Sequence, residues 1–397
     1  MTSISRSRAQ GITLVALGSL PTMAIAGLVA CLPLMFQQFA DVPNREWWVP
    51  MILTVPALCV ALFSGPIGLL ADRWGRRPVL LLSLVAFTAC GALPLLFDSL
   101  PSIIASRAVV GLGEAGILAV GNALIGDYFA EAERRHWLGI QVTVGPFIGS
   151  AYIILGGVLA GVSWKAPFLL YLLGAGVLVA ALAFLPEPQR TSSSAADSAT
   201  AGAAEPSTAF PWSTAAMIGI STLLAAVVYF LQAVQHGRIF ADLGVDSPER
   251  ISLYVTLASM GTVVGGYLYK ASRPRPVATL MGFSLACYGI AYVGVALAPN
   301  AMAGLLLDSL GQFGSGFLFP TLIAWALSCY AFEHRGRGMG LWAACFFLGQ
   351  FLSPPVMTLI AHGRLSFLQS VGVLGGLCLL AAAVLLAAGG RAPAVNR

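Results

Sequence analysis

Long apolar segments, separated by short charged or turn-forming clusters, run along almost the whole chain. A helix needs about 20 apolar residues to cross a bilayer, so each segment suits a membrane span. The segments are too continuous for the alternating strands of a membrane barrel. The pattern therefore predicts an all-α integral membrane protein with twelve transmembrane helices: Gly11–Phe39, Trp47–Leu70, Pro78–Phe97, Pro101–Phe129, Trp137–Gly161, Trp164–Leu185, Trp212–His236, Leu253–Leu268, Pro276–Leu297, Met302–Tyr330, Met339–Ala361 and Phe367–Ala388.

The segment between the sixth and seventh predicted helices has a different composition. Residues 186–211 are rich in Ser, Ala, Thr and Pro, which is typical of a flexible tether. We therefore predict an N-terminal six-helix bundle (residues 1–185), a linker (186–211) and a C-terminal six-helix bundle (212–397).

The two predicted bundles share short stretches of sequence. At an offset of 198, Gly68, Leu70, Arg77, Pro78 and Val79 match Gly266, Leu268, Arg275, Pro276 and Val277. At an offset of 200, Gly111, Gly116, Leu118, Glu133 and Arg135 match Gly311, Gly316, Leu318, Glu333 and Arg335. So few matches can arise by chance in a biased composition, but they fall at equivalent loops and helices. Duplication with a parallel repeat is therefore favoured.

Composition excludes several classes of protein. Apolar residues make up 58% of the chain and charged residues 9%, against about 25% charged in soluble proteins. A disordered or soluble chain is therefore excluded, and the lipid bilayer is the expected surrounding partner. The net charge of +5 does not indicate a nucleic-acid partner, because in a membrane protein the position of charge matters more than its sum.

The positions of Arg and Lys predict the orientation. If both termini are cytoplasmic, that side carries 15 of these residues and the opposite side 5, with Arg107 inside a span. The positive-inside rule therefore predicts cytoplasmic termini. Arginine outnumbers lysine 19 to 2, which is typical of a GC-rich bacterial source, so we expect the bacterial inner membrane.

The most specific motif lies between the second and third predicted helices. Residues 68–77 read GLLADRWGRR: Gly68 permits close helix contact, Gly75 permits a tight turn, and Asp72 can accept a hydrogen bond from Arg76. A basic loop that only sets topology is the alternative. The string resembles the signature loop of the major facilitator superfamily.

That resemblance implies a fold of two six-helix bundles around a central cavity, which rock between inward- and outward-open states. It also implies that Asp72 and Arg76 join Asp127 in a cytoplasmic latch of the outward-facing state. The expected latch comprises Gly68, Asp72, Arg73, Gly75, Arg76, Arg77 and Asp127. The second copy departs from the pattern, because Lys270 stands where Asp72 stands in the first.

The fourth predicted helix carries two charges. Arg107, Gly111 and Glu114 share one face, and an intramembrane charge costs roughly 2.5–3.5 kcal/mol, so it usually faces a cavity or a partner. The stretch resembles the second motif of the same superfamily, whose Arg is associated with proton coupling. Its Gly113-Glu114-Ala115 ending is similar to the spinster-type branch, which handles lipid-like substrates. A structural ion pair is the alternative.

The fifth predicted helix contains Gly145, Pro146 and Gly149. This element resembles the Gly-Pro-x-x-Gly pattern of antiporters in the superfamily, although Gln141 and Ser150 stand where the fuller pattern has glycines. The alternative interpretation is a proline kink with packing glycines.

Glu114 and Asp308 are the only acids predicted deep within the spans. We predict Glu114 as the proton carrier, because Arg107 on its face can change its affinity for protons as the helices move. Asp308 has no evident basic partner in its own helix, so it is expected to contact substrate or to serve as a second proton site. Capping of a broken helix near Gly311 and Gly314 is the alternative for Asp308. Candidate cavity-lining residues are Gln37, Asn122, Tyr152, Tyr229, Gln232, Gln312 and Gln350.

Some chemistry is missing from the sequence. Neither Lys165 nor Lys270 lies in a Walker loop, which excludes ATP-driven pumping by this chain alone. The four histidines, His136, His236, His334 and His362, all lie near predicted helix ends, so no metal site and no hydrolase site is expected in mid-membrane.

We therefore expect a non-enzymatic secondary transporter without a cofactor, working as a monomer and driven by the proton gradient. The leading interpretation is proton-coupled export of small amphipathic molecules. The alternatives are a symporter or facilitator for a nutrient or lipid-like substrate, and a receptor or enzyme that transports nothing.

Overall fold

The computed structural model of the protein describes residues 3–188, 209–271 and 275–389. Most of the predicted linker, residues 189–208, lies outside the described residues. The described parts contain twelve helical segments that are long and apolar enough to span a membrane, as the sequence predicts.

The N-terminal half comprises the elements up to residue 184. These are α1 (Ser3–Ala26), η1 (Val29–Cys31), α2 (Leu32–Gln38), α3 (Arg45–Trp74), α4 (Arg76–Ala92), η2 (Leu93–Leu95), α5 (Leu100–Tyr128), α6 (Glu131–Val162), η3 (Ala166–Leu172) and α7 (Leu173–Phe184).

The C-terminal half contains the remaining elements. These are α9 (Trp212–Asp242), α10 (Pro248–Ala271), α11 (Val277–Ala296), α12 (Ala301–Cys329), η4 (Phe332–His334), α13 (Arg335–Ala361) and α14 (Phe367–Gly389).

Several helices differ from their predicted bounds. The first predicted span is interrupted by a turn at residues 27–28, so it forms α1, η1 and α2. Helix α9 continues past its predicted end, His236, to Asp242. The predicted end falls where Gly237 and Arg238 interrupt the apolar pattern. Arg238 is only 18% exposed and packs among other helices, so the α-helix continues past it.

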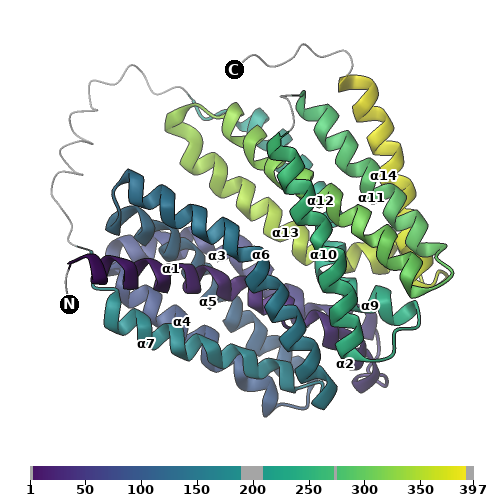
Figure 1. Cartoon of the computed structure of the whole chain (residues 1–397), viewed down its shortest axis with the longest axis horizontal. Coiled ribbons are helices and arrows are strands. Elements are labelled where there is room, and N and C mark those ends of the chain that lie inside the picture. Colours follow the sequence, from purple (N-terminus) through teal and green to yellow (C-terminus); the bar gives the residue numbers. More distant parts are fainter. Residues whose placement is uncertain (1–2, 189–208, 272–274, 390–397) are drawn as a thin grey trace.

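The two halves meet at one end of the molecule and diverge at the other (Figure 1). Helix α3 packs against α13, and α6 packs against α10, across the boundary between the halves. We call the end where the halves meet the closed end, and the end that carries both chain termini the open end.

Glycine packing shows the same difference between the ends. At the closed end, a Cβ on Gly157 of α6 would collide with Ser252 of α10, and a Cβ on Gly237 of α9 would collide with the carbonyl of Val29. Toward the open end, a Cβ on Gly68 or Gly340 would meet no atom within 4 Å. These two close approaches bring the helices of the two halves into contact at the closed end.

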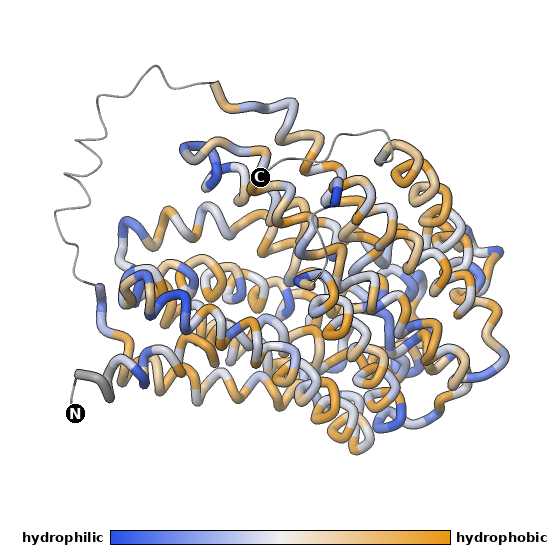
Figure 2. The backbone as a smooth tube through the Cα atoms, turned by 45° about the horizontal axis from the view of Figure 1, so that its top comes forward, coloured by the Kyte–Doolittle hydropathy of each residue, from blue (hydrophilic) through white to orange (hydrophobic). Residues whose placement is uncertain are grey.

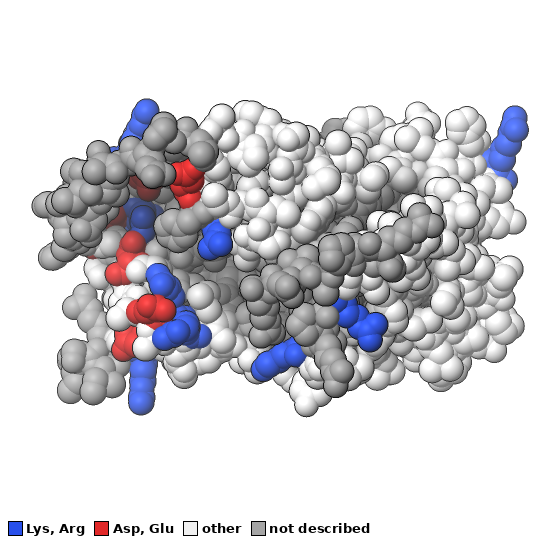
Figure 3. Space-filling view, turned by 90° about the horizontal axis from the view of Figure 1, so that it is seen from above, with Lys and Arg blue, Asp and Glu red and all other residues white. Residues whose placement is uncertain are grey.

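The outer surface of the bundle is apolar. Side chains such as Leu62, Val142 and Leu380 are more than half exposed, although they lie in the middle of long helices. Hydrophobic colour follows the helices in Figure 2, and the hydrophilic segments gather at turns and helix ends. On the face shown in Figure 3, acidic side chains gather toward the left, whereas basic side chains lie there, at the lower middle and at the far right, and large areas between them carry neither. An apolar surface of this extent requires a lipid surrounding.

Candidate functional site

Asp308 is fully buried in the C-terminal half and is held by two side chains of a neighbouring helix. Its Oδ1 accepts a hydrogen bond of 2.6 Å from Gln232 Nε2 of α9. Its Oδ2 lies 2.5 Å from Nε2 of His236, which is also buried. Gln232 and His236 are four residues apart, so they stand on the same face of α9. The helix thus presents an amide and an imidazole to one carboxylate of α12.

The contacts of this pair extend to a third helix. Gln312 Nε2 of α12 lies 3.4 Å from His236 Nε2. The Oε1 of Gln312 accepts a hydrogen bond of 2.6 Å from Thr262 Oγ1 of α10. A carboxylate beside an imidazole forms an ion pair when the imidazole is protonated. The contacts therefore link α9, α10 and α12 through buried polar side chains.

The structure corrects the sequence analysis at this site. His236 was expected near a helix end, but it lies six residues before the last residue of α9. The sequence shows no basic partner for Asp308 within its own helix, and the structure supplies one from α9. Both partners of Asp308 come from α9, which is far away in sequence: Gln232 and Asp308 are separated by 76 positions. The only local signal was the spacing of Gln232 and His236 on one helix face.

Arg107 is fully buried in the N-terminal half and caps a helix end. Its Nη2 donates to the carbonyls of Cys90 and Gly91, at 2.9 and 2.8 Å, in the last turn of α4. The rings of Phe168 and Tyr171 lie 5.0 and 4.7 Å from its guanidinium carbon. A cation at these carbonyls complements the negative end of the α4 dipole. These contacts give Arg107 a structural position between helices.

Glu114 is also buried, but it is not in contact with Arg107. Within the described part of the chain, neither forms an ion pair, and Oε1 of Glu114 has no hydrogen-bond partner. Seven residues of α-helix separate the two groups by about 10 Å along the axis, which explains the gap. Arg107 and Glu114 thus belong to the same helix, α5, but lie two turns apart and do not pair.

The signature loop joins elements of the N-terminal half. Arg76 forms an ion pair with Asp127 at the end of α5. Gly75 adopts φ +104°, a conformation that favours glycine, between α3 and α4. Both members of the Arg76–Asp127 pair belong to the same half, and the pair is formed while the adjacent end is open. This ion pair alone therefore does not bridge the halves. Asp72 and Arg73 are exposed in the last turn of α3.

Glu187 is a loop partner that the sequence analysis missed. Its carboxylate oxygens accept hydrogen bonds of 2.8 Å each from the backbone N–H groups of Arg76 and Arg77. These are the first residues of α4, whose N-terminus attracts negative charge. Arg77 also donates to the carbonyl of Leu182 in α7 at 3.0 Å. The start of α4 is thereby tied to the end of α7.

The antiporter-like element lies within a continuous helix. Gly145, Pro146 and Gly149 all belong to α6, where Gly149 is buried and Pro146 is exposed. A Cβ on Gly149 would lie 3.5 Å from Thr22 of α1, and a Cβ on Gly145 would meet nothing within 4 Å. Gly149 thus packs against α1, whereas Gly145 has free space beside it.

The predicted cavity-lining residues occupy different environments. Tyr152 shares a hydrogen bond of 3.0 Å with Ser19 of α1. Gln232 and Gln350 are buried, and Gln37 and Asn122 are exposed. Tyr229 and Gln312 are partly buried, each in contact with groups of the C-terminal half.

An aromatic cluster was missed because its rings come from three helices. It comprises Tyr229 and Phe230 of α9, Phe319 of α12, and Trp342 and Phe346 of α13. Trp342 and Phe346 stack with centroids 5.2 Å apart, and Phe319 lies 5.3 Å from Phe346. In the described residues, the buried Nε1 of Trp342 finds no acceptor. The cluster can stack on a planar apolar group and can donate one hydrogen bond.

Sequence comparison finds relatives among drug-resistance transporters. The tetracycline resistance protein, class C, of Escherichia coli is 28% identical over 329 residues, which are 78% of this chain and 79% of that protein. The class E protein of Escherichia coli is 31% identical over 154 residues, or 38% of this chain and 37% of that protein. An MFS-type transporter of Aspergillus terreus is 34% identical over 119 residues, so the match spans 30% of this chain and only 21% of that protein.

Solved structures share the fold at low sequence identity. A bacterial homologue of the human lysosomal transporter Spinster, inward-facing and occupied, has a TM-score of 0.73 at 17% identity, covering 98% of this chain and 96% of that chain. The D-xylose–proton symporter has a TM-score of 0.68 at 17% identity, covering 94% and 96%.

A sequence profile of the Major Facilitator Superfamily matches residues 12–312 and 251–396, which together cover most of the chain. The class C tetracycline resistance protein aligns along most of its length, and the fold agrees with that of the solved transporters. The chain therefore belongs to the Major Facilitator Superfamily, and it is a transporter rather than an enzyme.

Proposed function

We propose that this protein exports small amphipathic molecules in exchange for protons, by alternately opening its two ends. The observation that carries the proposal is the buried contact between Asp308 and His236. A desolvated acid in a transporter usually marks an ion or substrate path. The tetracycline resistance relatives support export as the direction.

The pair would couple a proton to a change in helix packing. Protonation of Asp308 removes the charge that attracts His236, so α12 and α9 lose an ionic contact. Movement of one charge down the membrane potential supplies about 2.3 kcal/mol per 100 mV. Asp308 thus replaces Glu114 as the first candidate for the proton carrier, because it has a titratable partner within reach. Glu114 is kept as the second candidate.

The aromatic cluster is the proposed support for substrate. Its rings lie on α9, α12 and α13, and Phe319 remains partly exposed. Aromatic faces bind planar apolar groups and cations, which suits amphipathic molecules. Because α9 carries both Tyr229 of this cluster and His236, substrate and proton would act on the same helix.

The proposed setting is the bacterial inner membrane with the open end facing the cytoplasm. The excess of Arg and Lys at the end that carries the termini supports this orientation. We propose that one chain works as a monomer, because both halves and the buried pair belong to a single chain. The antiporter-like element of α6 and the Arg76–Asp127 ion pair would then take part in closing the cytoplasmic end.

Proteoliposomes containing the purified protein test the proposal. With tetracycline and ethidium as probes, an acidic interior should drive accumulation of at least one probe, and collapse of the pH gradient should release it. Empty liposomes and liposomes with equal pH on both sides are the controls. Absence of proton-dependent flux for every probe tried, with folded protein, would contradict the assignment.

Symport of a lipid-like or nutrient substrate is the second candidate function. The spinster-like string Gly113-Glu114-Ala115 favours it, and a proton pair serves either direction. The same vesicles separate the two, because symport accumulates substrate when the exterior rather than the interior is acidic.

A further inference from the structure

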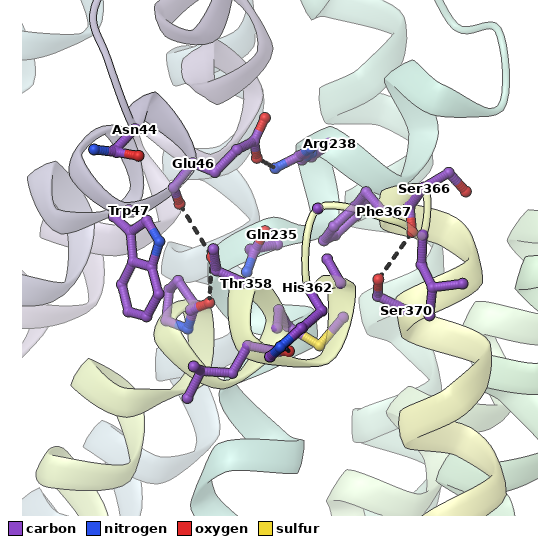
Figure 4. A pocket seen from close by; sticks show the side chains of 16 residues that line it. Asn44, Glu46, Trp47, Gln235, Arg238, Thr358, His362, Ser366, Phe367 and Ser370 are labelled. Atoms are coloured by element: carbon purple, nitrogen blue, oxygen red, sulfur yellow. Dashed lines mark hydrogen bonds and ion pairs between the residues drawn. The ribbon is translucent and has the colours of Figure 1, made fainter.

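A pocket of about 650 Å³ lies at the closed end, between the two halves (Figure 4). Asn44, Glu46 and Trp47 line it from the start of α3 and the residue before it. Gln235 and Arg238 of α9 line the other side, together with the end of α13 and the start of α14. The pocket therefore opens on the surface along which the halves must separate.

Arg238 joins the halves inside this pocket. Its Nη1 donates to Oε2 of Glu46 at 2.5 Å. Its guanidinium carbon lies 4.5 Å from the ring centroid of Phe36 in the N-terminal half and 4.3 Å from that of Phe367 in the C-terminal half. Thr358 of α13 adds a hydrogen bond of 3.3 Å to the carbonyl oxygen of Glu46. These are the polar contacts that hold α3 to α9 and α13 at this end.

Opening of the closed end must break the contact between Arg238 and Glu46, because they belong to different halves. The Glu46 side chain is 42% exposed and can be hydrated when it leaves. The Arg238 side chain is only 18% exposed, so it needs another partner for its charge.

Asp242 offers that partner on the same helix. It lies four residues after Arg238, at the end of α9, and its side chain is exposed. Residues spaced by four on a helix are neighbours, so the Arg238 guanidinium can reach this carboxylate by a rotamer change. Phe367 belongs to the same half as both residues and can keep its ring contact with Arg238 during the exchange.

We propose that Arg238 is a positioning residue for transport that exchanges its carboxylate partner, pairing with Glu46 when the closed end is shut and with Asp242 when it opens. The exchange keeps the cation neutralised in both states, so the ends can alternate without an unpaired half-buried charge.

The part of α9 that carries Arg238 also contacts Asp308. Gln232 and His236 face Asp308, and Arg238 points about 200° away from His236 around the helix. Gly237 lies between them with its backbone against Val29 of the N-terminal half. A shift of α9 would therefore move both contacts together. The proposed exchange rests on the alternating opening described above, but it does not depend on proton coupling.

Distances across the closed end test the exchange. Leu96 after η2 and Leu297 after α11 are each 77% exposed, so spin labels can be attached there through introduced cysteines. The seven native cysteines are replaced first, and distances are measured at fixed pH without substrate. Glu46→Gln should raise the ratio of long to short distances about twofold to fivefold, in the range for a partly exposed ion pair. Adding Asp242→Asn to Glu46→Gln should return the ratio toward its original value.

Asp246→Asn is the matched control, because Asp246 is an exposed acid of the following loop that does not line the pocket. It should leave the ratio unchanged in the Glu46→Gln background. An unchanged ratio in Glu46→Gln, or no reversal by Asp242→Asn, would overturn the exchange. The distances do not depend on proton-driven accumulation, so variants of Asp308 that lose accumulation should show the same distances. The exchange at Arg238 and the proton coupling at Asp308 can therefore be contradicted separately.

Discussion

The two halves of the molecule are both helix bundles, but their buried charged side chains have different kinds of partner. In the N-terminal half, Arg107 and Glu114 lie on one helix, two turns apart, and Arg107 is bound by carbonyls and rings. In the C-terminal half, Asp308 is bound by side chains of another helix. At the offset of 200 between the halves, Leu307 and Gly314 stand where Arg107 and Glu114 stand. The two halves thus share packing glycines such as Gly111 and Gly311 but not these buried charges.

This difference separates two uses of a buried charge. Nη2 of Arg107 is bound by backbone carbonyls, which carry no exchangeable charge, so this contact stabilises one structure. Asp308 instead lies beside an imidazole, a group whose charge changes with protonation. We therefore expect transport to depend most on the C-terminal pair and stability most on Arg107.

The largest expected effect is on proton-driven transport by the C-terminal pair. Asp308→Asn keeps the hydrogen-bonding shape but cannot bind the proton, so accumulation should fall at least about tenfold while downhill exchange persists. His236→Gln should give a similar loss. Because both changes remove one interaction, the double variant should lose little more than either single variant. Accumulation in proteoliposomes measures all three, and full activity of Asp308→Asn would move the proton site elsewhere.

The next effect is on the stability of the N-terminal half. Arg107→Ala leaves the carbonyls of Cys90 and Gly91 without their donor and opens a cavity beside Phe168 and Tyr171. The loss should be about 2–4 kcal/mol, seen as a lower thermal unfolding midpoint in detergent. Arg107→Lys should recover part of it, because the ammonium can reach a carbonyl but cannot lie flat between the rings. A midpoint equal to that of the unmodified protein would rule out the capping role.

A smaller effect is expected at the other buried acid. Glu114→Gln keeps a polar side chain at a position where no ion pair is formed, so accumulation should stay within about threefold of the unmodified protein. The assay is the one used for Asp308→Asn, which makes the two acids directly comparable. If only Glu114→Gln abolishes accumulation, the N-terminal half carries the proton and the comparison between the halves is reversed.

The smallest effect is expected at the signature loop. Asp127→Asn removes the ion pair with Arg76, whose members are 25% and 29% exposed. A partly exposed pair contributes about 0–1 kcal/mol, so the unfolding midpoint should move by only a few degrees. Glu187→Gln is a useful companion, since it weakens a different contact at the start of α4. A large loss of stability in Asp127→Asn would show that the pair is better shielded than its exposure indicates.

Sequence reasoning located the charged residues but not all of their partners. It identified Asp308, Arg107, Glu114 and the signature loop, because charges within long apolar segments stand out. It missed His236 as a partner of Asp308, since His236 stood at the predicted end of its helix and the two residues lie on different helices. The aromatic cluster was missed for a related reason: Phe and Trp residues are common in apolar segments, and only helix packing brings these five together.

The sequence by itself determined that the chain is a membrane protein and where its twelve spans lie. It could do so because the length and continuity of apolar segments are set locally, by the thickness of the bilayer. Only the tertiary structure decided which groups meet Asp308 and Glu46. The partners of Asp308 and Glu46 lie on other helices, 76 positions away for Gln232 and 192 for Arg238. Such contacts depend on how the helices pack and rotate, and no pattern within a single helix contains that information.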